Sequence, residues 1–290
     1  MNKMTLRRDA KSQKIDRAGQ AWKSVLLTGG LAIGLIVFVF PFWWLLVAST
    51  RSATEIYSKT PHLTPGTEFF NNLNRLMAST DFGTAIMNSV IVSVSYVIIG
   101  GVVCALAGYA FAQYQFKGSK VLFGLVIAVM SLPGQVTLVP LFKMMLNLGW
   151  LGSYQALILP DLAMPFGVFL MRQAMSSFPK TIVEAARIDG AGELRIFATI
   201  VLPAMKPSLA ALAIFMFLAR WNDFTYPLVV QRSPDQYTIP VALATLQGIG
   251  TTDYGQLLAG TALSVLPVLV LFIFLQKEFV SGMLAGSIKE

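Results

Sequence analysis

The chain has 290 residues and a formal net charge of +8, and 55% of its residues are hydrophobic while only 12% are charged. Soluble domains contain about 45–50% apolar and about 25% charged residues, so these proportions exclude an ordinary soluble globule. They also exclude a disordered chain, which holds few apolar residues. The composition predicts an all-α polytopic membrane protein in contact with lipid.

Six apolar stretches of roughly membrane-spanning length follow one another along the chain. They predict six transmembrane helices at 25–48, 85–112, 121–141, 154–171, 207–230 and 256–276. The first stretch is longer than the apolar region of a cleaved signal peptide, so we interpret it as a retained anchor. The predicted organisation is therefore a cytoplasmic segment 1–24, a first span 25–48, an external loop 49–83, a core domain 84–280 with an internal loop 174–206, and a cytoplasmic tail 281–290.

The basic residues are distributed unevenly between the two sides of these spans. Sixteen of them lie in the N-terminal segment, the loops after spans 2 and 4, and the C-terminal tail, against five on the opposite side. An excess of lysine and arginine marks the cytoplasmic side, which predicts that both termini are cytoplasmic. The net charge is thus interpreted as an orientation signal. A basic N-terminal arm that binds lipid or RNA is the less favoured alternative, and no nucleic-acid partner is predicted.

Several kinds of chemistry are excluded by residues that the chain lacks. A single cysteine, Cys104, excludes an internal disulfide, and one histidine, His62, excludes a zinc site built from several histidines. No G-x-x-x-x-G-K-[ST] run for binding nucleotide phosphates occurs. We therefore predict no catalytic residue, no metal site and no cofactor in this chain. Cys104 is expected to pack among apolar neighbours, and the external loop with His62 is expected to form a short helix at 72–77.

The internal loop 174–206 has the pattern of a helix, a turn and a second helix. Pro179 suits a helix start, Asp189–Gly190 suits a tight turn, and Pro203 is expected to interrupt the second helix. Two short amphipathic helices beside a membrane can lie on lipid headgroups, or they can form a rigid knob in a partner's groove. The physical pattern alone leaves both interpretations open.

The spacing of residues in this loop resembles a known motif without a gap. Glu184-Ala185-Ala186, then Gly190, then Ile200-Val-Leu-Pro203 is similar to the EAA loop of bacterial ABC-type importer permeases. In those importers the loop forms a coupling helix that sits in a cleft of the ATPase subunit. The resemblance implies that the ATPase contact is made by Glu184, Ala185, Ala186, Asp189, Gly190, Leu202 and Pro203.

Further motifs resemble the carbohydrate-uptake branch of this family over roughly residues 80–290, and in particular its MalG-like subunit. They are Ser131–Pro140, Ile158–Asp161, Arg187–Ala191, Trp221–Phe224 and Gly282–Lys289. The final Glu290 departs from the small residue expected in that tail, which puts a tail contact in doubt. The resemblance implies a sister permease in a heterodimer, two ATPase subunits that bind ATP and Mg²⁺, an extracytoplasmic solute-binding protein and a location in the bacterial inner membrane.

Polar residues occur at membrane depth, where ionisable groups are costly and usually face a cavity or a partner. At about 1.5 Å per residue, Arg220 and Asp161 both lie ~10 Å below the outer face, which predicts an ion pair between spans 4 and 5. Asp223 at i+3 is the rival partner of Arg220. These residues, together with Trp221, Asn222 and Tyr226, either line a sugar path or lock two permease subunits together.

The predicted function is that of a permease subunit that moves a carbohydrate inward by alternating access, with a partner ATPase docked on the EAA-like loop. The alternative is an ATP-independent secondary transporter coupled to an ion gradient through Asp161, Arg220 and Asp223. Secondary transporters usually contain inverted repeats, and no internal repeat is evident here. A membrane-embedded enzyme lacks the expected nucleophile and metal constellations. The sequence does not identify the solute.

Overall fold

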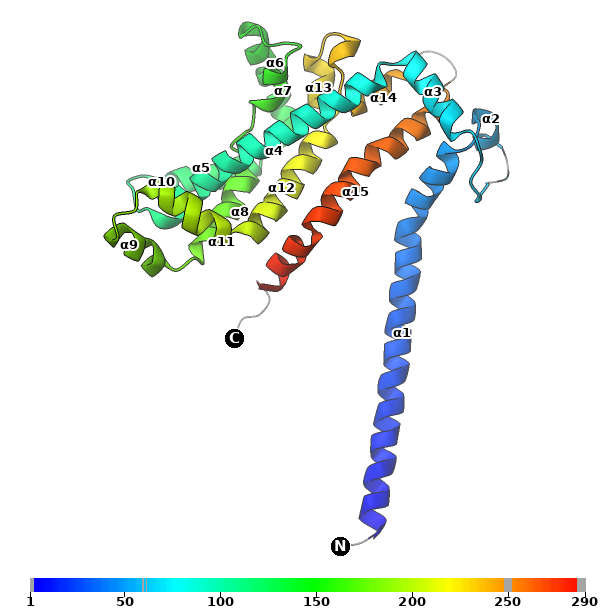
Figure 1. Cartoon of the computed structure of the whole chain (residues 1–290), viewed down its shortest axis with the longest axis vertical. Coiled ribbons are helices and arrows are strands. Elements are labelled where there is room, and N and C mark those ends of the chain that lie inside the picture. Colours follow the sequence, from blue (N-terminus) through cyan, green and yellow to red (C-terminus); the bar gives the residue numbers. More distant parts are fainter. Residues whose placement is uncertain (1–2, 59, 61, 248–251, 286–290) are drawn as a thin grey trace. The chain divides into compact units, whose positions relative to one another are not determined.

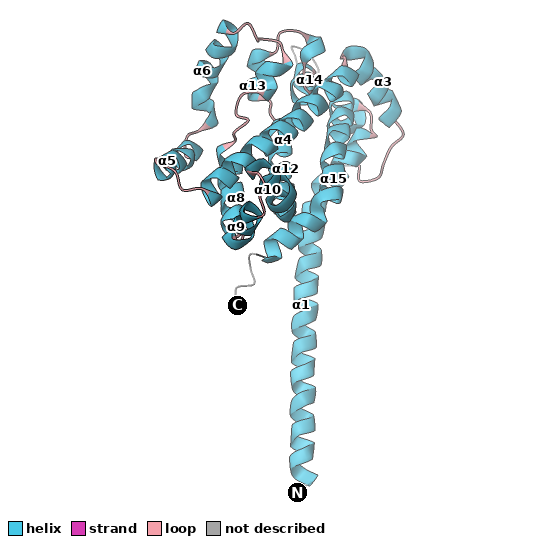
Figure 2. Ribbon diagram, turned by 60° about the vertical axis from the view of Figure 1, so that its left-hand side comes forward, coloured by secondary structure: helices cyan, strands magenta, loops and turns pink. Residues whose placement is uncertain are grey.

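The computed structural model describes residues 3–58, 60, 62–247 and 252–285, and in this part of the chain all regular secondary structure is helical, as predicted. Figure 2 shows helices and loops without a strand among these residues. The elements are α1 (Lys3–Ser49), α2 (Ala53–Ile56), α3 (Phe69–Ser79), α4 (Phe82–Gln113), α5 (Ser119–Met130), α6 (Gly134–Asn147), α7 (Tyr154–Ile158), α8 (Pro165–Ser176), α9 (Lys180–Ile188), α10 (Glu193–Ile196), the π-helix η1 (Phe197–Val201), α11 (Leu202–Ala204), α12 (Lys206–Trp221), α13 (Thr225–Val230), the 3₁₀-helix η2 (Pro234–Gln236), α14 (Ile239–Thr245) and α15 (Tyr254–Ala285).

The first compact unit contains α1, α2, the start of α3 and the first residues of α15. The side-chain amide of Asn72 donates to the carbonyls of Ser49 and Arg51, at 2.9 and 2.8 Å, and so ties the loop back to the end of α1. Arg51 also forms an ion pair of 3.0 Å with Glu55. The short helix predicted at 72–77 is confirmed within α3.

The second unit is built around α4, which packs along α8 and α12 (Figure 1). Its main hydrophobic cluster joins buried residues of α4, such as Cys104 and Tyr109, to Met171 of α8 and Leu212 of α12. The predicted burial of Cys104 among apolar side chains is confirmed. The same cluster extends into the loop after α8, so the loop and the apolar helices share one core.

Three helical segments are long and apolar enough to cross a membrane, namely Ser24–Ser49, Phe82–Gln113 and Tyr254–Lys277. The described residues give up to five spans if each of two sharply bent helix pairs counts as one, so the six-span count and the cytoplasmic termini stay predictions. The span expected at 121–141 is divided into α5 and α6, which meet at 103° (Figure 2).

The spans expected at 154–171 and 207–230 are also divided rather than continuous. α7 and α8 are separated near Pro160, and Pro165 starts α8, because proline cannot continue the hydrogen bonding of a preceding helix. α12 and α13 are separated at residues 222–224. Glu290 lies outside the described residues.

Candidate functional site

The loop 174–206 folds as a helix, a turn and a second helical segment, which confirms the predicted pattern. α9 begins after Pro179, and the backbone turns at Gly190, whose φ is +81°. Glycine adopts this left-handed conformation without the steric cost that other residues meet, which explains the Asp189–Gly190 sequence. The second segment runs from α10 through η1 into α11.

Pro203 does not interrupt the second segment, contrary to expectation. It lies inside α11 directly after the π-helix η1, where the amide of Leu202 bonds to the carbonyl of Phe197 and the regular pattern is already broken. The chain instead bends at Met205, where the preceding segment meets α12 at 84°. Leu202 packs against the core, whereas Pro203 is exposed.

The two faces of α9 differ in burial. Val183 and Ala186 are buried in the core cluster. Glu184 and Ala185 are exposed on the other side, as are Asp189 and Gly190 at the turn. Of the residues predicted at the ATPase contact, Ala186 therefore supports α9 from within, and the others that belong to α9 and its turn are accessible. The loop is a helix seated on the core with one free polar face.

Two large apolar side chains of the loop, which the sequence analysis did not assign to the contact, are also exposed. Ile188 is 87% exposed and Leu194 is 75% exposed. Outside a membrane core, neighbouring exposed apolar side chains are a common feature of interaction surfaces. The sequence gives little indication that these two side chains are exposed, because Ile188 also fits the apolar pattern of α9.

Glu193, also missed by the sequence analysis, holds the loop to the end of α4. Arg187 donates to its carboxylate at 2.5 and 3.3 Å, and the hydroxyl of Tyr109 donates at 3.2 Å. A further short hydrogen bond comes from the hydroxyl of Tyr114. The hydrogen bonds from Arg187 and then from Tyr114 lower the pKa of Glu193 to about 2, so the carboxylate is ionised at neutral pH.

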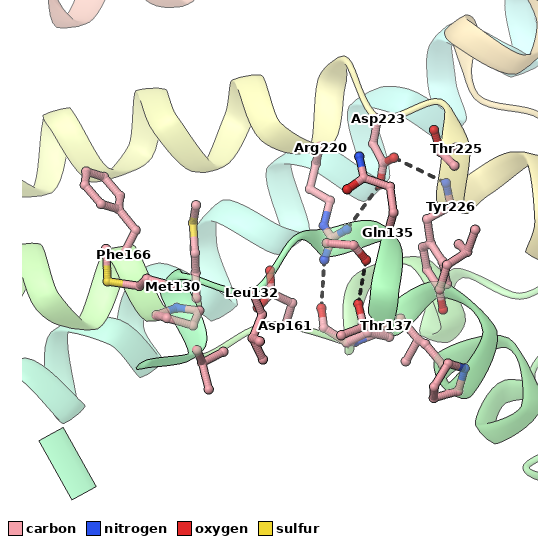
Figure 3. A pocket seen from close by; sticks show the side chains of 18 of the residues that line it. Met130, Leu132, Gln135, Thr137, Asp161, Phe166, Arg220, Asp223, Thr225 and Tyr226 are labelled. Atoms are coloured by element: carbon pink, nitrogen blue, oxygen red, sulfur yellow. Dashed lines mark hydrogen bonds and ion pairs between the residues drawn. The ribbon is translucent and has the colours of Figure 1, made fainter. Parts of the chain in front are cut away.

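A pocket of about 880 Å³ lies where three helix breaks come together. Leu132 of the α5–α6 break, Asp161 of the α7–α8 break and Asp223 of the α12–α13 break all line it (Figure 3). Gln135 and Thr137 add polar groups from α6. Irregular backbone at membrane depth is tolerated where it lines a cavity. The pocket therefore accounts for the three helix breaks that lie around it.

Arg220 pairs with Asp223, and the predicted ion pair with Asp161 is wrong. The guanidinium lies 3.3 Å from the Asp223 carboxylate and donates to the carbonyl of Pro160 at 2.8 Å (Figure 3). Asp161 instead accepts from the hydroxyl of Tyr96, at 3.4 Å on its carboxylate and 2.9 Å on its carbonyl. The prediction failed because it assumed a continuous helix, whereas Asp161 lies in the break with a φ of +62°.

Trp221 and Tyr226 connect helices within the chain. Trp221 is buried, and its indole nitrogen donates to the carbonyl of Ser264 in α15 at 3.0 Å. The hydroxyl of Tyr226 donates to the carbonyl of Ala156 in α7 at 2.9 Å. Asn222 is exposed and bonds its own helix. Of these three residues only Tyr226 lines the pocket, beside Arg220, Asp161 and Asp223.

We expect Asp223→Asn to lower the thermal stability of the protein in detergent more than Asp161→Asn does. The first variant removes the charged partner of Arg220, whose side chain is only 12% exposed, and an uncompensated buried charge costs about 3–5 kcal/mol. A double-mutant cycle with Arg220→Gln measures this, because the double variant with Asp223→Asn should recover part of the loss. Equal losses from the two aspartate variants would contradict the pairing.

The sequence model of the family described as "binding-protein-dependent transport system inner membrane component" matches residues 97–283. The match contains the whole loop 174–206 and every residue that lines the pocket. It therefore covers both candidate sites and most of the second unit.

Individual proteins of this kind are similar over nearly the whole chain. The arabinooligosaccharides transport system permease protein AraQ of Halalkalibacterium halodurans is 39% identical, with 92% of this chain and 96% of that protein covered. The lactose transport system permease protein LacG of Rhizobium radiobacter is 32% identical, with 89% and 94% covered. A chain from the crystal structure of a bacterial ABC transporter involved in the import of the acidic polysaccharide alginate has the same fold, with a TM-score of 0.78, 20% identity and 88% and 96% covered.

Proposed function

The chain belongs to the binding-protein-dependent transport system inner membrane components, and from this membership we propose that it is a permease subunit of an ATP-driven carbohydrate importer. It works with a sister permease, two ATPase subunits that bind ATP and Mg²⁺, and an extracytoplasmic solute-binding protein. The names of AraQ and LacG, which refer to arabinooligosaccharides and lactose, support a carbohydrate as solute. The chain itself carries out no bond chemistry.

The observation that carries this function is the geometry of the loop with the EAA-like sequence. α9 buries Val183 and Ala186 in the core and exposes Glu184 and Ala185. This arrangement supports a docking face for the ATPase subunit, in which Ala185 permits close approach and Glu184 offers a charge to a polar partner group. We call this face, composed of Glu184, Ala185, Ile188 and Asp189, the dock.

The solute path in this subunit runs along the pocket at the helix breaks. Its polar lining supports this role, because carboxylates, amides and hydroxyls can exchange hydrogen bonds with sugar hydroxyls while the surrounding apolar residues exclude bulk water. ATP binding closes the ATPase dimer and moves the dock, and the movement opens the path alternately to the binding protein and to the cytoplasm. Trp221 and Tyr226 keep the helices around the path in place.

The test is reconstitution of the complete complex in vesicles with ATP on the ATPase side. We expect one loaded sugar-binding protein to stimulate ATP hydrolysis and to drive uptake of its sugar, whereas the unloaded protein does neither. Uptake that continues in vesicles without the ATPase subunits would contradict the proposed function and favour a secondary transporter.

Glu184→Lys should lower ATP-driven uptake by about tenfold or more. The variant places a positive charge against partner groups that are complementary to a carboxylate, and this mismatch weakens docking. Uptake by reconstituted complexes measures this, with membrane insertion checked by immunoblot. Asp235→Lys makes the same charge change at an exposed carboxylate outside the dock, and it should retain uptake. Full uptake by Glu184→Lys would exclude Glu184 from the dock.

A further inference from the structure

The Glu193 carboxylate bridges the loop and the cytoplasmic end of α4, and its partners come from both. Arg187 of α9 supplies two hydrogen bonds, and Tyr109 and Tyr114 supply one each from the last turn of α4 and the residue that caps it. Two parallel bonds between arginine and a carboxylate are strong and fix orientation as well as distance. The carboxylate is therefore a joint between the dock and a long helix.

The hydrogen bonds of the joint stabilise the loop, but apolar packing is what keeps the loop folded. Val183, Ile196 and Val201 are almost completely buried in the core cluster and hold α9, α10 and η1 in place. The ring of Phe197 also lies against that of Tyr109, with 5.3 Å between the ring centroids. Because this packing is apolar, variants that lose only the polar joint should keep the loop folded.

α4 connects this joint to the pocket. Tyr109, at the joint, and Tyr96, which donates to Asp161 at the α7–α8 break, lie on α4 thirteen residues or about 20 Å apart. The helix contains no proline and runs without a break from Phe82 to Gln113. The helix is also continuous through Gly100 and Gly101, so α4 is a direct structural connection between Tyr109 and Tyr96, the partner of Asp161.

We propose that Glu193 and its partners Arg187, Tyr109 and Tyr114 form a coupling joint, through which movement of the dock is transmitted along α4 to the helix break at Asp161. This inference rests on the proposed function and specifies how that function is carried out. Arg187 and Glu193 are positioning residues in this scheme, because they act through α4 and not on the solute.

The test compares variants that separate the joint from the loop's own ion pair. Tyr109→Phe/Tyr114→Phe removes both hydroxyls from Glu193 but keeps its pairing with Arg187. Tyr237→Phe is the matched control, because no hydrogen bond of the Tyr237 hydroxyl is found in the described part of the chain. Each variant is reconstituted as the full complex, and sugar taken up per ATP hydrolysed is measured together with cross-linking of the dock to the ATPase.

We expect the double tyrosine variant to keep its cross-link and its ATP hydrolysis while uptake per ATP falls about tenfold or more, because each of the two lost hydrogen bonds to a charged group is equivalent to at least about that factor. Tyr237→Phe should keep the wild-type ratio. An unchanged ratio in the double variant, or a loss of the cross-link together with uptake, would overturn the joint. A wild-type complex without ATP-driven uptake would instead overturn the proposed function.

Discussion

Replacing Gly190 with proline will abolish ATP-driven uptake and stimulated ATP hydrolysis while the transmembrane helices remain inserted. Gly190 has a φ of +81°, and proline is fixed near −65°, so the turn after α9 cannot form. Proline also removes the amide that bonds to the carbonyl of Arg187 at 3.0 Å. The dock would lose its connection to α10, and Glu193 would no longer face Arg187. Reconstituted uptake and ATPase assays measure the effect.

Gly192 provides a control two residues away on the same turn. Its φ of −70° suits any residue, and an added Cβ would meet no atom within 4 Å, so Gly192→Ala should retain uptake. Uptake by Gly190→Ala should lie between that of Gly190→Pro and that of Gly192→Ala, because alanine reaches positive φ at a cost of about 1 kcal/mol. If Gly190→Pro transports at the wild-type rate, the loop is not the coupling element.

The loop could be predicted from the sequence because its structure depends on local signals. A short apolar face ends at Asp189–Gly190, and the conformation that this pair favours is the one that the backbone adopts. The Glu193 joint could not be predicted from the sequence, because Tyr109 and Tyr114 lie about 80 residues away from Glu193 in the chain. No periodic pattern encodes a contact between two segments that meet only after the core has formed.

The membrane polar cluster was only partly predictable for a related reason. The rival partner of Arg220 was identified, because Asp223 lies one helical turn away and that spacing is visible in the sequence. The failure concerned Asp161, whose depth was counted along a helix that the structure interrupts near Pro160. A helix break changes the depth and the direction of the side chains that follow it, so a depth counted by residue number fails once the span is interrupted, as it is before Asp161.

The close packing of α4 on α8 leads to the second large effect. A Cβ on Gly108 would lie 2.6 Å from the Cβ of Met171 and 2.7 Å from the backbone nitrogen of Arg172. Backbone atoms cannot move aside as a flexible side chain can, so Gly108→Ala must force the two helices apart. Overpacking of this kind typically costs about 1–3 kcal/mol, more than the roughly 1 kcal/mol that alanine gains over glycine in a helix.

We therefore expect Gly108→Ala to lower the unfolding temperature of the purified protein and its yield from membranes. Gly101→Ala in the same helix is the matched control, because its Cβ would meet nothing within 4 Å and alanine's helix propensity should keep or raise stability. Since α4 also carries Tyr96 and Tyr109, separating it from α8 should reduce uptake even where protein remains inserted. A Gly108→Ala variant as stable as Gly101→Ala would show that the helices do not pack this closely in the membrane.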